Sequence, residues 1–283
     1  MKTLFQTKKE SNLIFDVGLH LGEDTAYYLK CGFRVIAIEA DSELVEKCRI
    51  RFKDEISNSQ LIIVEGAISD EESKTVKFFK NKNVSVWGTV VNNWAKRNEF
   101  LGTQSELIEV NKIDFKECLI KYGIPFYLKV DIEGMDMVCL RELLEFENKP
   151  DYISVESDKL SFEKIRKEFE LLKKLGYSKF KAINQADVPN QNKLIKDEFG
   201  DFQNYLFEEG SSGLFGEETP KKWKSHKQII LEYRKIFFFY KLFGDYGIAP
   251  KKIKKRLLKI FSSISQETIP GWYDTHAKHD NVI

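Results

Sequence analysis

The sequence predicts an α/β protein built on a doubly wound, mostly parallel sheet of seven strands, with helices covering both faces. Short apolar runs alternate along the chain with segments of helical periodicity, which is the pattern of such a sheet. The runs are apolar throughout, as expected for strands buried on both faces. The first run ends in a glycine-rich turn and the second in an acidic residue, so we expect a ligand at the carboxyl ends of the strands.

Each element is predicted from its own stretch of sequence. Apolar runs predict strands at residues 12–18, 33–39, 61–65, 75–79, 107–110, 125–131, 152–156, 180–184 and 205–207. Helical periodicity and capping residues predict helices at residues 23–30, from 41 onward, 113–122, 135–147, 162–175 and 228–243. Residues 81–103, rich in Asn, Trp and Gly, fit neither pattern and are long enough to form a functional loop.

Composition indicates a soluble globular protein. Of 283 residues, 42% are hydrophobic and 31% charged. No apolar run approaches the ~18 residues of a membrane span, and the basic amino terminus leads to no apolar stretch of a secretory signal. The four cysteines lack the spacing of a zinc ribbon or a disulfide scaffold. We therefore expect reduced cysteines and a cytoplasmic protein.

Charge is distributed unevenly along the chain. Residues 221–283 hold 14 Lys and Arg against 5 Asp and Glu, whereas residues 1–220 hold 31 against 39. We therefore expect a catalytic domain at 1–220 and a basic, aromatic-rich helical extension at 221–283. Its basic amphipathic segment, Lys251–Phe261, suits an anionic bilayer, which would place the protein at the inner membrane face near a lipid-linked acceptor. Packing onto the body, or onto a second copy in a homodimer, is the simpler interpretation.

The turn after the first predicted strand favours a nucleoside-containing cofactor. Gly18 and Gly22 allow a ligand to approach the backbone. Glu39 lies at the end of the second strand, 21 residues after Gly18. That spacing suits a carboxylate that accepts the hydroxyls of an adenosine ribose.

The residues around this turn favour S-adenosylmethionine over NAD. A dinucleotide site uses Gly-x-Gly-x-x-Gly to seat a pyrophosphate on the helix N-terminus, but position 20 is His. Glu23 and Asp24 at the helix start would repel a pyrophosphate, whereas they suit the cationic sulfonium and amino group of S-adenosylmethionine. Asp16 is a candidate partner of that amino group or of the glycine-turn amides, and a capping acid is the alternative.

Four sequence blocks carry a resemblance to a known family: Phe15-Asp-Val-Gly-Leu-His-Leu-Gly-Glu-Asp-Thr25, Ile38-Glu-Ala-Asp41, Gly66-Ala-Ile-Ser-Asp70 and Leu128-Lys-Val-Asp-Ile-Glu-Gly-Met-Asp136. From about residue 11 to residue 215, where Gly210-Ser-Ser-Gly-Leu-Phe also fits, the chain resembles the FkbM-type methyltransferases. The resemblance implies a class I, Rossmann-like, S-adenosylmethionine-dependent fold and O-methylation of sugars or natural products. Family members usually carry Asn and Pro where this chain has His20 and Ala40. The cofactor-binding positions we expect are Asp16, Gly18, His20, Gly22, Thr25, Glu39, Ala40 and Ala67.

The most specific block offers two candidate catalytic carboxylates. Lys129, Asp131 and Glu133 alternate, so they would project from one face if the strand continued through Glu133. An alcohol needs a general base as it attacks a sulfonium methyl. We favour Glu133 as that base and Asp131 as a residue that orients cofactor or substrate. A purely structural set of ion pairs is the alternative.

Three further residues are weaker substrate or base candidates. Glu156 ends the next strand and, with the two carboxylates above, offers oxygen ligands to Mg²⁺, although the absence of His or Cys at fixed spacing does not favour a metal. Trp87 in the long loop, with Ser85 and Trp94 nearby, suits stacking on a sugar ring or simple core packing. His276 is an alternative base if the tail folds back over the site, and otherwise part of a loose end.

The sequence therefore predicts an S-adenosylmethionine-dependent O-methyltransferase that acts on a hydroxyl of a glycan or specialised metabolite. An NAD-dependent oxidoreductase is the first alternative, weakened by the missing third glycine. An RNA methyltransferase or RNA-binding module is the second, suggested by the basic tail. The sequence lacks the Asn/Asp-Pro-Pro-Tyr/Phe block of amino-directed nucleic-acid enzymes, so nucleic acid is not the favoured partner.

Overall fold

The computed structural model describes residues 3–158, 161–196, 201–243 and 272–282. The chain forms two compact units, residues 1–156 and residues 157–283. Within the described residues, no helix is long and apolar enough to cross a membrane. All four cysteines are free, as the sequence predicts.

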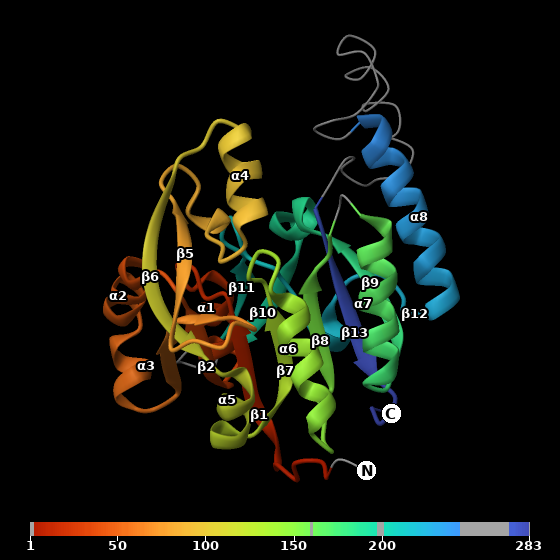
Figure 1. Cartoon of the computed structure of the whole chain (residues 1–283). Helices are drawn as coiled ribbons and strands as arrows, with labels where there is room; N and C mark the ends of the chain where they lie inside the picture. Colours follow the sequence, from red (N-terminus) through yellow and green to blue (C-terminus); the bar gives the residue numbers. More distant parts are fainter. Residues whose placement is uncertain (1–2, 159–160, 197–200, 244–271, 283) are drawn as a thin grey trace. The chain divides into compact units, whose positions relative to one another are not determined.

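The first unit is built on a parallel sheet of strands in the order β8-β7-β1-β2-β3 (Figure 1). These strands are β1 (Lys9–Val17), β2 (Arg34–Glu39), β3 (Leu61–Glu65), β7 (Ile124–Val130) and β8 (Tyr152–Glu156). β-Branched residues dominate β2 and β3, and such side chains suit a buried pleated strand. The strand order reverses between β1 and β7, and ligands of open α/β sheets bind outside the carboxyl ends of the strands at such a point.

Helices alternate with strands along the first unit, as the pattern of the sequence predicts. They are α1 (Glu23–Lys30), α2 (Ser42–Arg51), α3 (Lys53–Ser57), α4 (Asn92–Phe100), α5 (Phe115–Tyr122) and α6 (Asp136–Glu142), with short 3-10 turns η1 (Ser85–Trp87) and η2 (Leu143–Glu145). Asp41 caps α2 through a hydrogen bond from the Glu43 amide, and Asp114 caps α5 through one from Glu117. The predicted α/β class with a mostly parallel sheet is confirmed.

A second, smaller sheet of the first unit has the order β4-β6-β5, with strands β4 (Ala67–Ile68), β5 (Thr75–Asn81) and β6 (Ser105–Ile113). β5 and β6 are antiparallel, and the segment between them carries η1 and α4 (Figure 1). We call residues 75–113 the β5–β6 insertion. The prediction of an irregular stretch at 81–103 was wrong for α4, because its Asn-rich sequence has low intrinsic helix propensity.

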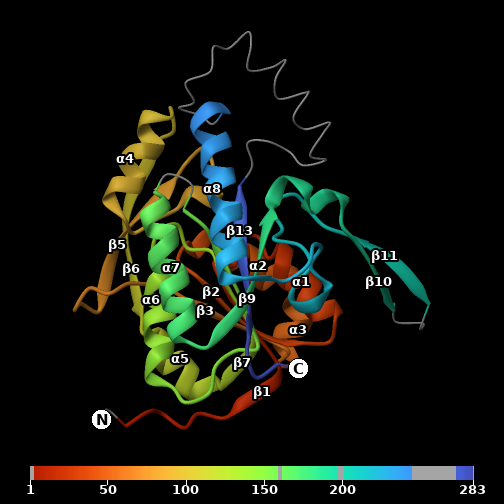
Figure 2. The same cartoon turned by 90° about the vertical axis from the view of Figure 1, so that its right-hand side faces the viewer.

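In the second unit, β9 (Tyr177–Asn184) pairs antiparallel with both β12 (Lys224–Ser225) and β13 (Tyr273–His279). β10 (Asn192–Lys196) and β11 (Phe202–Leu206) form a separate antiparallel hairpin that extends away from β9 (Figure 2). The helices are α7 (Phe162–Lys174) and α8 (His226–Phe243), with 3-10 turns η3 (Gln185–Asn190) and η4 (Gly216–Glu218).

The structure changes the expected organisation of the carboxyl-terminal part. α8 confirms the predicted helix, but the extension expected to be helical also contains the strand β13, which belongs to a sheet with β9. The two compact units divide after Glu156, whereas the functional boundary predicted at residue 220 remains a prediction. The basic amphipathic segment Lys251–Phe261 lies outside the described residues.

Candidate functional site

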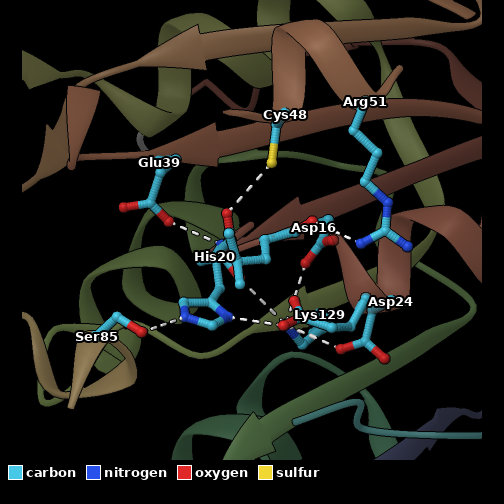
Figure 3. Close-up of polar contacts among 11 residues, drawn as sticks. Asp16, His20, Asp24, Glu39, Cys48, Arg51, Ser85 and Lys129 are labelled. Atoms are coloured by element: carbon cyan, nitrogen blue, oxygen red, sulfur yellow. Dashed lines mark hydrogen bonds and ion pairs between the residues drawn. The ribbon is translucent and has the colours of Figure 1, made fainter. Parts of the chain in front are cut away.

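Two charged side chains face each other in the middle of the parallel sheet. Asp16 of β1 is the register partner of Lys129 of β7, and the Lys129 Nζ lies 3.1 Å from the Asp16 Oδ1 (Figure 3). The Lys129 Nζ also lies 3.2 Å from the Asp24 Oδ2, and the Thr25 hydroxyl donates to the Asp16 Oδ2 at 2.6 Å. Asp16 is fully buried, so its carboxylate is held by groups of the chain itself.

The carboxylates of this buried cluster favour the charged form of Lys129. Burial alone would lower the pKa of Lys129, but the neighbouring carboxylates of Asp16 and Asp24 outweigh it and raise that pKa well above its usual value. Lys129 was expected to stand beside Asp131 and Glu133; it pairs instead with Asp16 and Asp24. The carboxylate of Asp24, which we expected to pair with a cationic group of the cofactor, therefore pairs with Lys129 instead.

The glycine turn after β1 packs closely against neighbouring segments of the chain. Gly18 and Gly22 have φ angles of 93° and 82°, in the left-handed region that favours glycine. A Cβ at Gly18 would overlap the carbonyl oxygen of Asp131, and one at Gly22 would overlap the ring of Phe52. The amide of Gly18 donates to the Ile38 carbonyl at 3.0 Å, so the turn is fastened to the end of β2.

Glu39 stands at the end of β2, where the sequence places the ribose acid. Its Oε2 accepts the His20 amide at 2.8 Å, and its Oε1 accepts the amides of Ala40 and Asp41 at 2.8 and 2.9 Å. Burial raises the pKa of Glu39, and the three amide hydrogen bonds oppose the rise. A carboxylate offers about four acceptor positions, so the described contacts leave room for one ribose hydroxyl on the Oε2.

His20 joins the turn to the β5–β6 insertion. Its backbone is left-handed (φ 51°), a conformation in which Asn and His are enriched among non-glycine residues. The Nδ1 lies 2.9 Å from a Glu23 carboxylate oxygen, and the Nε2 lies 2.8 Å from the Ser85 hydroxyl (Figure 3). Burial would raise the pKa of Glu23, but the hydrogen bond and charge of His20 lower it.

The candidate catalytic carboxylates lie in a turn, not on a strand. β7 ends at Val130, and Glu133 has a left-handed φ of 44°, so the condition under which the three side chains would project from one face of a strand is not met. The Asp131 amide donates to the Val17 carbonyl at 2.9 Å, which ties the turn to the end of β1. Glu133 is 6% exposed, and its carbonyl accepts the Thr89 hydroxyl of the insertion at 2.8 Å. A strained buried acid beside the glycine turn is a functional candidate.

Asp136 is a residue of this turn that sequence reasoning missed. Its two carboxylate oxygens accept the amides of Ile132 and Gly134, each at 3.2 Å, and so brace the segment that carries Glu133. Burial, with the nearby charge of Asp131, raises the pKa of Asp136 to about 7. The signal in the sequence was the acid that closes the Lys-Val-Asp-Ile-Glu-Gly-Met-Asp block.

The raised pKa of Asp136 predicts a pH-dependent stability. Between its ordinary pKa of 3.8 and the folded value of about 7, the unfolded chain loses its proton first, so the free energy of unfolding falls as pH rises. We expect the difference in that free energy between wild type and Asp136→Asn to shrink, or turn negative, over this range. Urea unfolding of both proteins across the window measures it, and a difference independent of pH would contradict the assignment.

The other predicted site residues have mixed surroundings. The Thr25 hydroxyl donates a hydrogen bond to the Asp16 carboxylate, and the Ala40 amide donates one to the Glu39 carboxylate. Ala67 follows Gly66, whose amide donates to the Glu39 carbonyl at 2.8 Å, so this block also reaches the end of β2. Glu156 ends β8, and Trp87 lies in η1. Within the described ranges, no group of three or more His, Cys, Asp or Glu could hold a metal ion.

His276 belongs to the second unit and is not part of a loose end. It lies in β13 opposite Lys181 of β9 and is 2% exposed. Burial and the charge of Lys181 lower the pKa of His276 to about 3, so its imidazole is neutral at pH 7. A nitrogen of such low basicity is poorly matched to proton abstraction, which argues against His276 as the base.

Comparison with known families decides the class of protein. A family model described as the methyltransferase FkbM domain matches residues 16–179, more than half of the chain. The chain belongs to the FkbM methyltransferase family. The matched residues include the glycine turn, Glu39 and the Asp131–Asp136 turn. The resemblance read from the sequence is thus confirmed, and the NAD-dependent oxidoreductase alternative was wrong.

Three of the solved structures to which this FkbM-family chain is similar are named as methyltransferases. A methyltransferase FkbM from Methylobacillus flagellatus KT is 16% identical with a TM-score of 0.38, over 70% of this chain and 44% of that chain. An O-methyltransferase from Bacillus cereus in complex with SAH is 10% identical with a TM-score of 0.36, over 69% and 71%. A precorrin-6y C5,15-methyltransferase from Geobacter metallireducens GS-15 is 14% identical with a TM-score of 0.35, over 70% and 76%. No curated protein matches the chain.

Proposed function

We propose that this FkbM-family methyltransferase transfers a methyl group from S-adenosylmethionine to a hydroxyl of a sugar, glycan or specialised metabolite. The observation that carries the proposal is the meeting of two segments. The glycine turn after β1 packs directly on the backbone of Asp131, two residues before the buried Glu133. A turn suited to the donor and an acid suited to activating an alcohol therefore adjoin.

The residues at the ends of β1 and β2 fit the donor. Gly18 and Gly22 keep the turn free of side chains, and the Oε2 of Glu39 retains one acceptor position for a ribose hydroxyl. Lys129 fixes the turn, because its Nζ donates to the Gly18 carbonyl at 3.2 Å. Asp16 in turn pairs with the same Nζ. When bound, S-adenosylmethionine supplies an electrophilic methyl group on a sulfonium.

The acids after β7 fit activation of the acceptor. Glu133 is our candidate for the base that takes the proton of the hydroxyl, and the Asp131 carboxylate is a candidate for orienting the substrate. Asp136 fixes the backbone on both sides of Glu133 by accepting hydrogen bonds from the Ile132 and Gly134 amides. Holding oxygen and methyl in line would itself contribute much of the rate.

Titration with S-adenosylmethionine and NAD in parallel tests the donor. We expect saturable binding of S-adenosylmethionine alone, and Glu39→Ala should weaken it by about 10-fold or more, the value of a hydrogen bond to a charged group. Glu65→Ala is the matched control, because Glu65 ends β3 opposite Glu39 but pairs with Arg49 at 2.9 Å. Its affinity should stay within about two-fold of wild type, as for a surface pair.

Identification of the methylated product tests the acceptor. Isotope-labelled S-adenosylmethionine with a panel of hydroxylated sugars should yield methyl ethers that mass spectrometry and NMR locate on oxygen. Methylation only of nitrogen, carbon or RNA would overturn the O-methyl assignment while leaving the methyltransferase. Binding of NAD but not of S-adenosylmethionine would overturn the assignment of S-adenosylmethionine as the methyl donor. A lipid-linked acceptor, contact with the inner membrane face and a homodimer remain predictions from the sequence.

A further inference from the structure

The β5–β6 insertion places an arginine against two indoles. The guanidinium carbon of Arg97 lies 4.6 Å from the ring centroid of Trp94 and 6.0 Å from that of Trp87. Trp94 and Arg97 lie three residues apart on α4 and so share one face of the helix, whereas Trp87 comes from η1. Asn98 holds the backbone that carries the second indole, because its Nδ2 donates to the Trp87 carbonyl at 3.1 Å. The arginine is therefore held in place by rings.

Within the described part of the chain, the contacts of Arg97 are with the two indole rings, and no carboxylate lies within ion-pair distance of its guanidinium. Its Nη1 is fully buried and makes no hydrogen bond to any described residue. Arg97 as a residue is half-buried, but its Nη1 is shielded from water, and a polar atom that is buried without a hydrogen bond is costly. Stacking occupies the faces of a guanidinium and leaves its in-plane N–H groups for hydrogen bonds, which match the oxygens of a carboxylate or phosphate.

The indole of Trp94 lies between Arg97 and the candidate catalytic turn, because it contacts both. Trp94 packs on Gly134, where an added Cβ would lie 3.0 Å from the indole nitrogen. Thr89, between η1 and α4, donates to the Glu133 carbonyl at 2.8 Å. The Asn98 Oδ1 is likewise buried without a hydrogen-bond partner among the described residues and offers an acceptor for a hydroxyl. A cation, a hydroxyl acceptor and two indole rings thus gather beside the proposed base.

We propose that Arg97 binds an anionic group of the methyl acceptor, so that the substrate is a hydroxylated acid such as an acidic sugar. The inference rests on the proposed function and specifies its acceptor. Carboxylate and phosphate present the same oxygens to a guanidinium, and both chemistries are tested below. The donor also carries a carboxylate, but the residues proposed for it lie on the glycine turn and β2, whereas the Arg97 contacts lie on the Gly134 side.

Binding of simple sugars shows whether Arg97 recognises a carboxylate or a phosphate of the acceptor. The wild-type protein, saturated with S-adenosylhomocysteine, is titrated by calorimetry with D-glucuronate, glucose 6-phosphate and glucose. We expect one of the two acidic probes to bind about 10- to 100-fold more tightly than glucose, the range of a charge-assisted hydrogen bond. Arg97→Gln should abolish that preference and leave the affinity for S-adenosylhomocysteine within about two-fold. Lys96→Gln removes an exposed cation of the same helix and should retain the preference.

Each outcome is decisive. Unchanged S-adenosylhomocysteine binding by Arg97→Gln also shows that the variant folds. Equal binding of glucose and both acidic probes by the wild-type protein, or loss of the preference in Lys96→Gln as well, overturns the assignment of Arg97 and leaves the methyltransferase intact. Weakened S-adenosylhomocysteine binding by a folded Arg97→Gln overturns it in favour of a donor contact. Absence of S-adenosylhomocysteine binding in the wild-type protein would instead refute the proposed function.

Discussion

Replacing Lys129 by methionine is expected to lower the free energy of unfolding by about 3–5 kcal/mol, the cost of breaking a buried ion pair. Methionine fills a similar volume but supplies no charge, so the carboxylates of Asp16 and Asp24 would remain buried without their cation. The Gly18 carbonyl would also lose its donor. Urea unfolding followed by circular dichroism measures the change.

Two further variants show whether the loss of charge causes the lower free energy of unfolding of Lys129→Met. Lys47→Met removes an exposed lysine of α2 and should change the free energy of unfolding by less than about 0.5 kcal/mol. Combining Lys129→Met with Asp16→Asn and Asp24→Asn should recover part of the loss, since no uncompensated charge then stays buried. A loss in Lys129→Met as small as that in Lys47→Met would contradict the ion cluster.

Gly18→Ala is expected to destabilise the protein and to disrupt donor binding. Alanine at a φ of 93° carries a penalty of about 1–2 kcal/mol, and its Cβ would overlap the Asp131 carbonyl oxygen. The turn and the catalytic segment must then move apart, so we expect a total loss above about 3 kcal/mol, as for other large effects of overpacking and strain. S-Adenosylhomocysteine affinity should fall by about 10-fold or more.

Gly32→Ala is the matched control for backbone strain. Gly32 has a φ of 85°, and no atom lies within 4 Å of the position that an added Cβ would take, so the substitution meets strain without overlap. We expect a loss of about 1–2 kcal/mol and unchanged donor affinity. Similar losses in both variants would show that close approach between the turn and Asp131 does not govern the effect at Gly18.

Local signals in the sequence predicted the elements of the first sheet well. β3 and β8 begin and end where their apolar runs do, and α1 occupies the predicted residues 23–30. These elements are set by neighbouring residues: β-branched runs, caps and stop signals. β13 was missed because its pairing with β9 depends on residues far apart in the chain, which no short window contains.

The candidate site was predicted less evenly. Glu39 and the glycine turn follow from spacing alone, because the end of one strand and the start of the next helix are local features. The partners of Lys129 were not predicted, since a left-handed backbone at Glu133 has no signature when the residue is not glycine. The setting of Arg97 was also missed, because it requires α4 to be recognised in an Asn-rich segment.

The buried pair Asp16–Lys129 also bears on how faithfully the sheet assembles. Parallel strands as apolar as β1 and β7 gain similar hydrophobic burial in several alignments, so burial alone discriminates weakly among them. A shift of two residues keeps the same faces buried but would set Lys129 against Ile14 and Asp16 against Asp131. This shifted pairing would leave buried charges without a partner of opposite sign. We therefore expect the cluster beneath the glycine turn to favour the native alignment of β1 and β7 over the shifted one.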